Sequence, residues 1–135
     1  MKKKKKVRGY IFCRSFMGER APQHVQNIVI RDYCKRNKLS YLLSSTEYAM
    51  KNSYLMLEQV LEELQSIDGI AAYSLFQLPE DGKLRKKIYK RIINLKKEIH
   101  FAVEGLKVSK QKDISKIEDI WMVKQSLSNC IKKIK

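Results

Sequence analysis

Four short apolar runs alternate along the chain with three segments whose apolar residues recur every three or four positions. The apolar runs have the length of strands and predict them over about 8–13, 39–44, 69–76 and 98–104, with helices between them. Strict alternation of this kind requires right-handed crossovers and a mainly parallel sheet. The sequence therefore predicts an α/β protein, with a single three-layer domain around a four-stranded sheet of flavodoxin-like or resolvase-like type.

The two ends of the chain differ in composition from this central pattern. Residues 1–7 form a lysine-rich leader that we expect to be disordered, and 8–106 form the α/β domain. Residues 107–135 are predicted to be a polar linker followed by a C-terminal amphipathic helix. An apolar stripe on that helix must be buried, either on the domain or against a second copy or a pathway enzyme. The stripe includes Ile117, Ile120, Trp121 and Leu127.

The formal net charge is +15, from 29 basic and 14 acidic residues. Most of the basic residues are lysines, whereas base readout and bidentate phosphate contacts favour arginine. Abundant Lys, Ile, Asn and Tyr are also typical of an AT-rich coding sequence. These features favour a solvated basic surface over nucleic-acid binding, which stays as an alternative. Charges within "VRGYIFCRSF" interrupt the apolar core that a secretory signal needs, and we expect no membrane span and a cytoplasmic location.

The three cysteines do not indicate a disulfide framework or a metal site. Cys13, Cys34 and Cys130 are scattered and lack the spacing of paired ligands. Cys34 and Cys130 fall in helical patterns and are predicted to be small core residues. The sequence also lacks a phosphate-binding glycine loop and a dinucleotide fingerprint, so it predicts no cofactor.

Polar side chains follow each predicted strand, and the carboxyl ends of parallel strands share one edge of the sheet, where ligands bind. We therefore expect a ligand site at this edge. The candidate catalytic residues are Ser15, Glu19, His24 and Glu47. The candidate ligand-binding residues are Arg14, Arg20, Gln23, Thr46, Tyr48, Ser74, Gln77 and Glu104.

The candidate residues do not specify a reaction. Ser15 or Cys13 could act as a nucleophile, but neither has a neighbouring histidine to activate it. His24 could be a base or an ordinary surface histidine, and Glu19 and Glu47 could be an acid–base pair or ordinary loop carboxylates. Arg14 and Arg20, beside a helix that begins near Pro22, are suited to hold an anion.

The blocks "MGERAPQHVQN", "TEYAM" and "YSLFQLPED" resemble the sporadic carbohydrate cluster protein family, over about residues 8–108. Members are encoded among bacterial genes for surface polysaccharide, including lipopolysaccharide, and their reaction is not established. The resemblance implies a pathway and not a reaction. Together with the ligand site expected at the edge of the sheet, it favours a phosphorylated or nucleotide-linked sugar as the partner. It also implies serine at the position of Cys13 and proline at that of Ser15, which weakens both as catalytic residues.

A second resemblance concerns architecture. The stretch "DGIAAYSLFQLPED" and the "GY" that opens the first strand are similar to the catalytic domain of serine recombinases. That family has an Asp-Arg-Leu-Gly-Arg run in the corresponding stretch. Aligned on Leu78, this chain has Phe76, Gln77, Pro79 and Glu80 instead. The resemblance thus implies the fold, whereas the missing arginines count against recombinase chemistry.

Overall fold

The computed structural model describes residues 3–134, with side chains described through residue 129. A five-stranded sheet has the order β2-β1-β3-β4-β5, with β5 antiparallel to β4 and the other pairs parallel. The strands are β1 (Lys6–Phe12), β2 (Ser40–Glu47), β3 (Gly69–Ala72), β4 (Glu98–Phe101) and β5 (Leu106–Val108). The helices are α1 (Gln23–Arg36), α2 (Leu55–Glu63), α3 (Gly82–Asn94) and α4 (Gln111–Ile134), with a 3-10 turn η1 (Leu75–Gln77) after β3.

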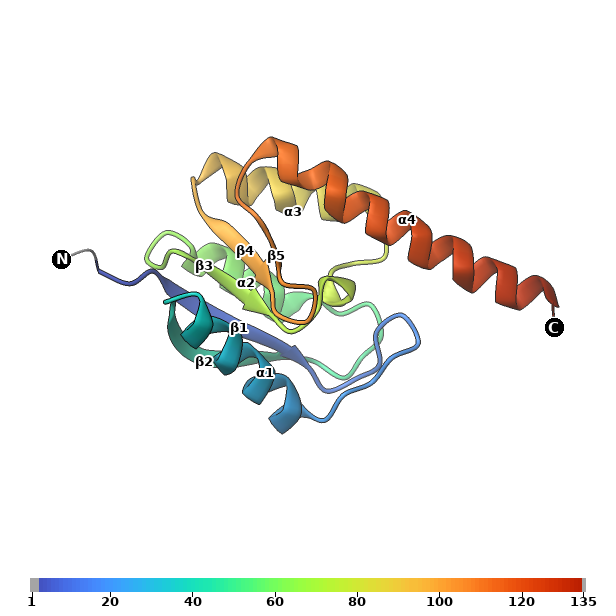
Figure 1. Cartoon of the computed structure of the whole chain (residues 1–135), viewed down its shortest axis with the longest axis horizontal. Helices are drawn as coiled ribbons and strands as arrows, with labels where there is room; N and C mark the ends of the chain where they lie inside the picture. The colour runs from blue at the N-terminus through green and yellow to red at the C-terminus, as the bar shows by residue number, and fades with distance from the viewer. Residues whose placement is uncertain (1–2, 135) are drawn as a thin grey trace.

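The predicted α/β class and mainly parallel sheet are confirmed, and the two faces of the sheet are covered unequally (Figure 1). Helix α1 packs on one face, where Val7 and Ile11 of β1 meet Ile30. Helices α2, α3 and α4 contribute to the larger core on the other face, which includes Tyr10 and Phe12. Successive side chains of a strand point to opposite faces, so each central strand is buried on both sides.

Several boundaries differ from the sequence prediction. The sheet has five strands and not four, because β5 spans the predicted boundary between domain and linker, and α4 begins at Gln111. Strand β3 ends at Ala72, since the capping box of Ser74 and Gln77 starts η1 in what the sequence predicts as strand. Strand β1 begins within the predicted leader, where Val7 is fully buried. Residues 1 and 2 of that leader lie outside the described residues.

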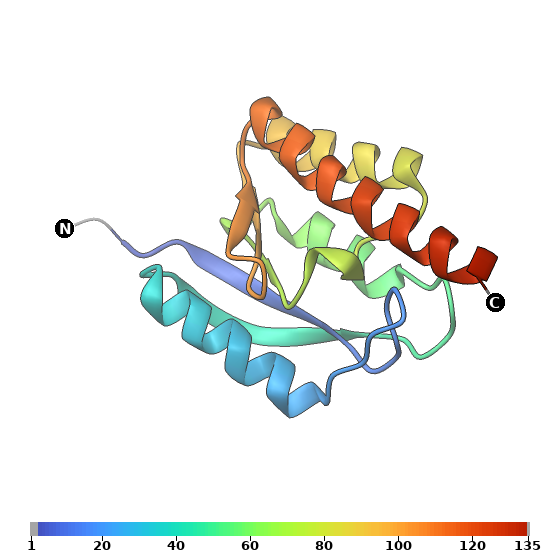
Figure 2. The same ribbon diagram turned by 45° about the vertical axis from the view of Figure 1, so that its right-hand side comes forward.

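Helix α4 docks on the domain through its N-terminal half, as one of the two sequence interpretations expects. Ile117 and Trp121 are buried, and the Arg85 guanidinium lies 4.1 Å from the Trp121 ring centroid. Arg85 also donates two hydrogen bonds of 2.9 Å to Glu118, joining α3 to α4. Figure 2 shows α4 continuing past the sheet beyond this contact.

Two further predictions from the sequence concern the cysteines and membrane spans. Cys34 is buried in the α1 core as predicted, whereas the side chain of Cys130 lies outside those described. Within residues 3–134, none of the helices combines the length and the apolar character needed to cross a bilayer.

Candidate ligand-binding rim

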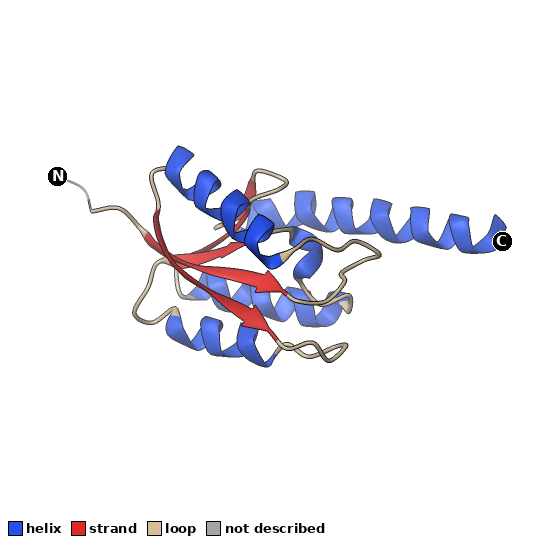
Figure 3. Ribbon diagram, turned by 90° about the horizontal axis from the view of Figure 1, so that it is seen from below, coloured by secondary structure: helices blue, strands red, loops and turns tan. Residues whose placement is uncertain are grey.

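The carboxyl ends of β1, β2 and β3 meet at one edge of the sheet, as Figure 3 shows. The loops that follow these strands surround a pocket of about 380 Å³, which we call the rim pocket. Its lining combines two cations, a carboxylate, polar uncharged groups and aromatic rings. The lining residues are Phe12, Arg14, Ser15, Phe16, Met17, Gly18, Ala49, Lys51, Asn52, Tyr54, Phe76 and Glu80.

Arg14 is the best-positioned cation of the rim pocket. Its Nη1 and Nη2 donate to the backbone carbonyls of Tyr48 and Ser53, at 2.5 and 2.9 Å. Its guanidinium carbon lies 4.2 Å from the Phe12 ring centroid and 5.2 Å from that of Tyr54. These contacts fix the guanidinium on an aromatic surface, and it has no ion pair with any side chain that the structure describes, so its charge stays available to an anion.

The rest of the pocket lining was only partly anticipated from the sequence. Ser15 was predicted and is exposed on the wall. Lys51 and Tyr54 were missed, because they lie in or beside a segment predicted to be a polar connection. The aromatic Tyr54, directly before a helical stripe, was the one available signal.

Glu47 was predicted as an acid or base, but both oxygens of its carboxylate accept hydrogen bonds that hold the fold together. It is 1% exposed and accepts from the Tyr10 hydroxyl at 2.9 Å. It also accepts from the backbone N–H groups of Tyr48, Met56 and Leu57 at 3.0–3.1 Å. Two of these N–H groups belong to the first turn of α2, where a carboxylate is favoured by the helix dipole. Glu47 therefore holds the start of α2 and does not reach the rim pocket.

Gln77 has a similar structural role. Its Nε2 donates to Gln26 Oε1 at 2.8 Å, and its Oε1 accepts from the Ser74 N–H. Gln26 in turn exchanges hydrogen bonds with both backbone groups of Phe12. Both glutamines are fully buried, so this pair joins the end of β1 to the turn after β3.

Buried Ser74 and half-buried Glu104 form a second hydrogen-bonded pair at the rim. The Ser74 hydroxyl donates to Glu104 at 2.8 Å, and the Leu75 N–H donates at 2.9 Å. Burial raises the pKa of Glu104, opposed by these hydrogen bonds. The pair connects η1 to the β4–β5 turn and lies outside the rim-pocket lining.

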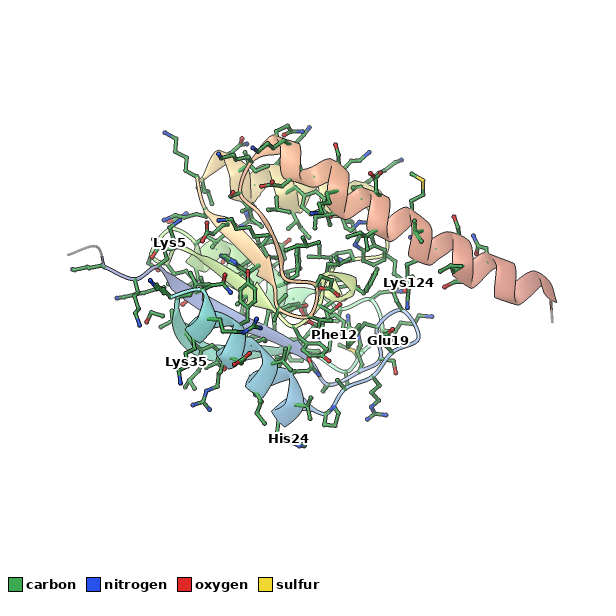
Figure 4. All side chains as sticks on the ribbon, viewed as in Figure 1. Lys5, Phe12, Glu19, His24, Lys35 and Lys124 are labelled. Atoms are coloured by element: carbon green, nitrogen blue, oxygen red, sulfur yellow. The ribbon has the colours of Figure 1, made fainter. Side chains whose placement is uncertain are left out.

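The other predicted residues lie around the rim pocket without lining it. Glu19 pairs with Lys124 of α4 at 3.1 Å, and His24 lies on the exposed side of α1 (Figure 4). The Cys13 thiol contacts the Glu47 carbonyl at 3.4 Å. The remaining predicted residues outside the lining are Arg20, Gln23, Thr46 and Tyr48. The structure thus brings Arg14 and Ser15 together and leaves Arg20 apart from them.

A second hollow of about 490 Å³ adjoins the rim pocket and shares three lining residues with it, Met17, Gly18 and Glu80. Its other wall is α4, which contributes Gln125, Ser128 and Asn129. The Gly18 φ of 78° lies in the left-handed region, which favours glycine. That backbone turn forms part of the wall common to both hollows.

No protein-family model matches the chain, and no curated protein matches it. Solved structures that are similar in fold include the following two. One, a resolvase family site-specific recombinase from Streptococcus pneumoniae, has a TM-score of 0.62 and 11% identity over 95% of this chain and 98% of its own. The fold is resolvase-like. The other, the N-terminal catalytic domain of TP901-1 integrase, has a TM-score of 0.56 and 10% identity over the same shares.

This resolvase-like fold confirms the architectural resemblance found in the sequence. The residues that replace the recombinase acidic and arginine run have structural contacts here. Phe76 packs edge-on against Trp121 at a centroid distance of 5.2 Å, and Gln77 is bound to Gln26. Pro79 is buried, and its carbonyl accepts from Arg85.

Proposed function

We propose that the protein binds a phosphorylated or nucleotide-linked sugar in the rim pocket and acts in surface-polysaccharide biosynthesis. Arg14 would hold the phosphate group, with Lys51 beside it. Ser15, Asn52 and Glu80 would receive the sugar.

The observation that carries the proposal is the state of Arg14. A guanidinium has five N–H donors, and the two carbonyls of Tyr48 and Ser53 accept from only part of this set. The remaining donors belong to a group already fixed in position, so an anion binds without first ordering a long side chain. Planar donors of this kind suit a phosphate oxygen pair.

The other groups of the pocket favour a sugar phosphate over a bare polyanion. Glu80 lines the same space as Arg14 and Lys51. A carboxylate repels phosphate but accepts hydrogen bonds from sugar hydroxyls, as the Asn52 side chain also can. The Tyr54 and Phe76 rings offer apolar faces to a sugar ring or a base.

The adjoining hollow supports a ligand longer than a sugar monophosphate. Its α4 wall presents the amides of Gln125 and Asn129 and the Ser128 hydroxyl, all uncharged donors and acceptors. Such groups suit a nucleobase or a second sugar. The resemblance to the sporadic carbohydrate cluster family supports the same ligand class.

A non-catalytic role through α4 is the second candidate, because this helix also carries an apolar surface. Val123 and Leu127 are 59% and 58% exposed and line a hollow of about 340 Å³ with Phe76 and Ile120. This surface would suit a second copy of the chain or a pathway enzyme. Removing residues 109–135 would also expose Ile117 and Trp121, so the sharper variant is Val123→Asp/Leu127→Asp, measured by sedimentation.

A titration calorimetry panel tests the ligand proposal, using UDP-glucose, glucose 1-phosphate and a 20-base-pair DNA duplex. We expect sugar-ligand binding that Arg14→Ala weakens at least about tenfold, the loss typical of a charge-assisted contact. Arg20→Ala is the matched control, since Arg20 lies outside the pocket lining. Binding of duplex alone, with a steep salt dependence, would support the nucleic-acid alternative instead. Equal effects of the two variants would contradict the assignment of the rim pocket.

A further inference from the structure

A separate hollow of about 600 Å³ lies on the α1 face of the sheet, away from the rim pocket. We call it the open-face hollow. Helix α1 packs on β1, β2 and β3, whereas β4 and β5 contact α3 and α4 through their opposite face. The α1 face of β4 and β5 is therefore bordered by the hollow, between the end of α1 and the segment before β1.

A chain of buried titratable groups forms one wall of the open-face hollow. The Tyr33 hydroxyl is 2.7 Å from His100 Nδ1, and His100 Nε2 is 2.8 Å from Glu98 Oε1. Lys5 Nζ donates to the other Glu98 oxygen at 3.2 Å. Tyr33, His100 and Glu98 are each 5% exposed or less. The hydrogen bond with His100, helped by Lys5, lowers the pKa of Glu98 to about 2 against the raising effect of burial.

Small residues on the neighbouring strand leave space for the hydrogen-bonded Tyr33, His100 and Glu98 side chains. Gly69 of β3 pairs with Glu98, and a side chain on Gly69 would begin 2.4 Å from the Glu98 carbonyl oxygen. The other register partner of this face, Ala71 beside His100, is also small. Small residues on β3 thus leave space for Glu98 and His100 on the α1 face.

The rest of the hollow is strongly cationic. Five lysines line it, and Glu98 is the single carboxylate among the lining residues. Lys107 is the register partner of His100 on β5, so both side chains lie on one face of the sheet. Among the described residues, Lys5 is the one lysine of the five with an ion pair, and it engages Glu98. The lysines are Lys3, Lys4, Lys5, Lys38 and Lys107.

We propose that the open-face hollow binds a small phosphate-type oxyanion, and that protonation of His100 strengthens this binding. The site is independent of the rim pocket and of the function proposed for it. Lys38 and Lys107 would contact the anion from the α1 end and from β5. Its volume suits a small phosphate ester rather than a nucleic-acid duplex.

The hydrogen-bond chain explains the coupling to protonation. When His100 is neutral and donates from Nε2 to Glu98, its Nδ1 accepts the Tyr33 hydroxyl proton. Protonation at Nδ1 turns this bond around, so the hydroxyl oxygen accepts and its proton becomes free to point into the hollow. The titratable groups around His100 come from every element at the hollow: Tyr33 of α1, Glu98 of β4, Lys107 of β5, Lys38 after α1, and Lys3, Lys4 and Lys5 before β1. Protonation therefore adds one positive charge and one donor to the site.

An NMR titration with sodium sulfate tests the proposal on the full chain. Sulfate resembles phosphate but does not titrate near neutral pH, and sodium chloride at the same ionic strength corrects for screening. By linkage, saturating sulfate should raise the His100 pKa by about half a pH unit or more. The other histidine, His24, lies exposed on α1 and is the internal control. The largest amide shifts should fall at residues 105–107 and 37–39.

Matched charge variants separate this site from the general basic surface. Lys38→Gln/Lys107→Gln should weaken sulfate binding at least about fivefold, as expected for the loss of two charged contacts. The control Lys86→Gln/Lys90→Gln removes the same charge from the exposed side of α3 and should leave the affinity unchanged. The proposal is overturned if the two double variants have equal effects, or if sulfate raises the pKa of His24 as much as that of His100.

Discussion

Two regions of the rim contain similar residue types and use them differently. In the inner region, Glu47 and the Gln26–Gln77 pair are buried and their polar atoms bind other parts of the chain. In the outer region, Arg14 and Ser15 face a pocket. A polar residue at a strand end is thus structural when a neighbouring backbone needs its atoms, and open to a ligand when it does not.

The comparison predicts that inner-region variants lower stability, whereas outer-region variants lower ligand affinity at nearly unchanged stability. A variant with both effects, or with the opposite effect, would break the distinction.

Glu47→Ala should have the largest effect on stability. It removes the acceptor of three backbone N–H groups and of the Tyr10 hydroxyl. We expect a loss of about 3 kcal/mol in the free energy of unfolding, because buried donors are left without partners. Urea denaturation measures the loss, with Glu62→Ala on the exposed side of α2 as control. A loss no greater than that of the control would show that Glu47 is free for another role.

We expect the ionised Glu98 carboxylate to stabilise the fold, and this stabilisation to be lost in acid. Its pKa is lowered from 4.5 to about 2, so its stabilising contribution is complete above about 4.5 and is lost as pH falls through about 2. The contribution should be about 1–3 kcal/mol. Unfolding free energies between pH 5 and 2 should therefore fall more steeply for the wild type than for Glu98→Gln. Parallel curves would contradict the buried Glu98–His100 pair.

Gln77→Leu should destabilise by about 2 kcal/mol, since it leaves the buried Ser74 N–H and one Gln26 contact unsatisfied. Thermal unfolding measures the loss, against Gln59→Leu on the exposed side of α2. Sugar-ligand affinity should stay within about twofold of the wild type, because Gln77 does not line the rim pocket. A selective loss of affinity would move Gln77 into the ligand site.

Ser15→Ala should have the smallest effect on stability, within about 0.5 kcal/mol, because the side chain is exposed. It should weaken sugar-phosphate binding about threefold to tenfold through loss of one hydrogen bond. Calorimetry compares Ser15→Ala with Ser126→Ala, since Ser126 is exposed and lines neither the rim pocket nor the adjoining hollow. If binding persists but a slow turnover of the ligand disappears, Ser15 has a chemical role in addition to a binding role.

The sequence determined the architecture of this protein through its alternation of apolar runs and helical stripes. That pattern requires parallel strands with crossovers, and it also places polar strand ends along one edge. The ends of the strands were harder to predict from the sequence. Strand β5 is only three residues long, and the capping box that ends β3 lies in an apolar run that resembles a strand. Local composition cannot reveal a short edge strand whose stability comes from pairing with β4.

Only the tertiary structure decided which rim residues are free. Arg14 and Glu47 both follow predicted strands, and their sequence contexts are equally polar. The Glu47 carboxylate is occupied because α2 begins beside it. Arg14 is available because backbone carbonyls and aromatic rings hold it with no ion pair among the described side chains. Likewise, His100 and Tyr33 are far apart in sequence. They meet only because α1 packs on the face of the sheet to which the His100 side chain of β4 points. The sequence specifies which polar group stands at a position. Whether a buried neighbour needs that group as a hydrogen-bond partner depends on which segments the fold brings together.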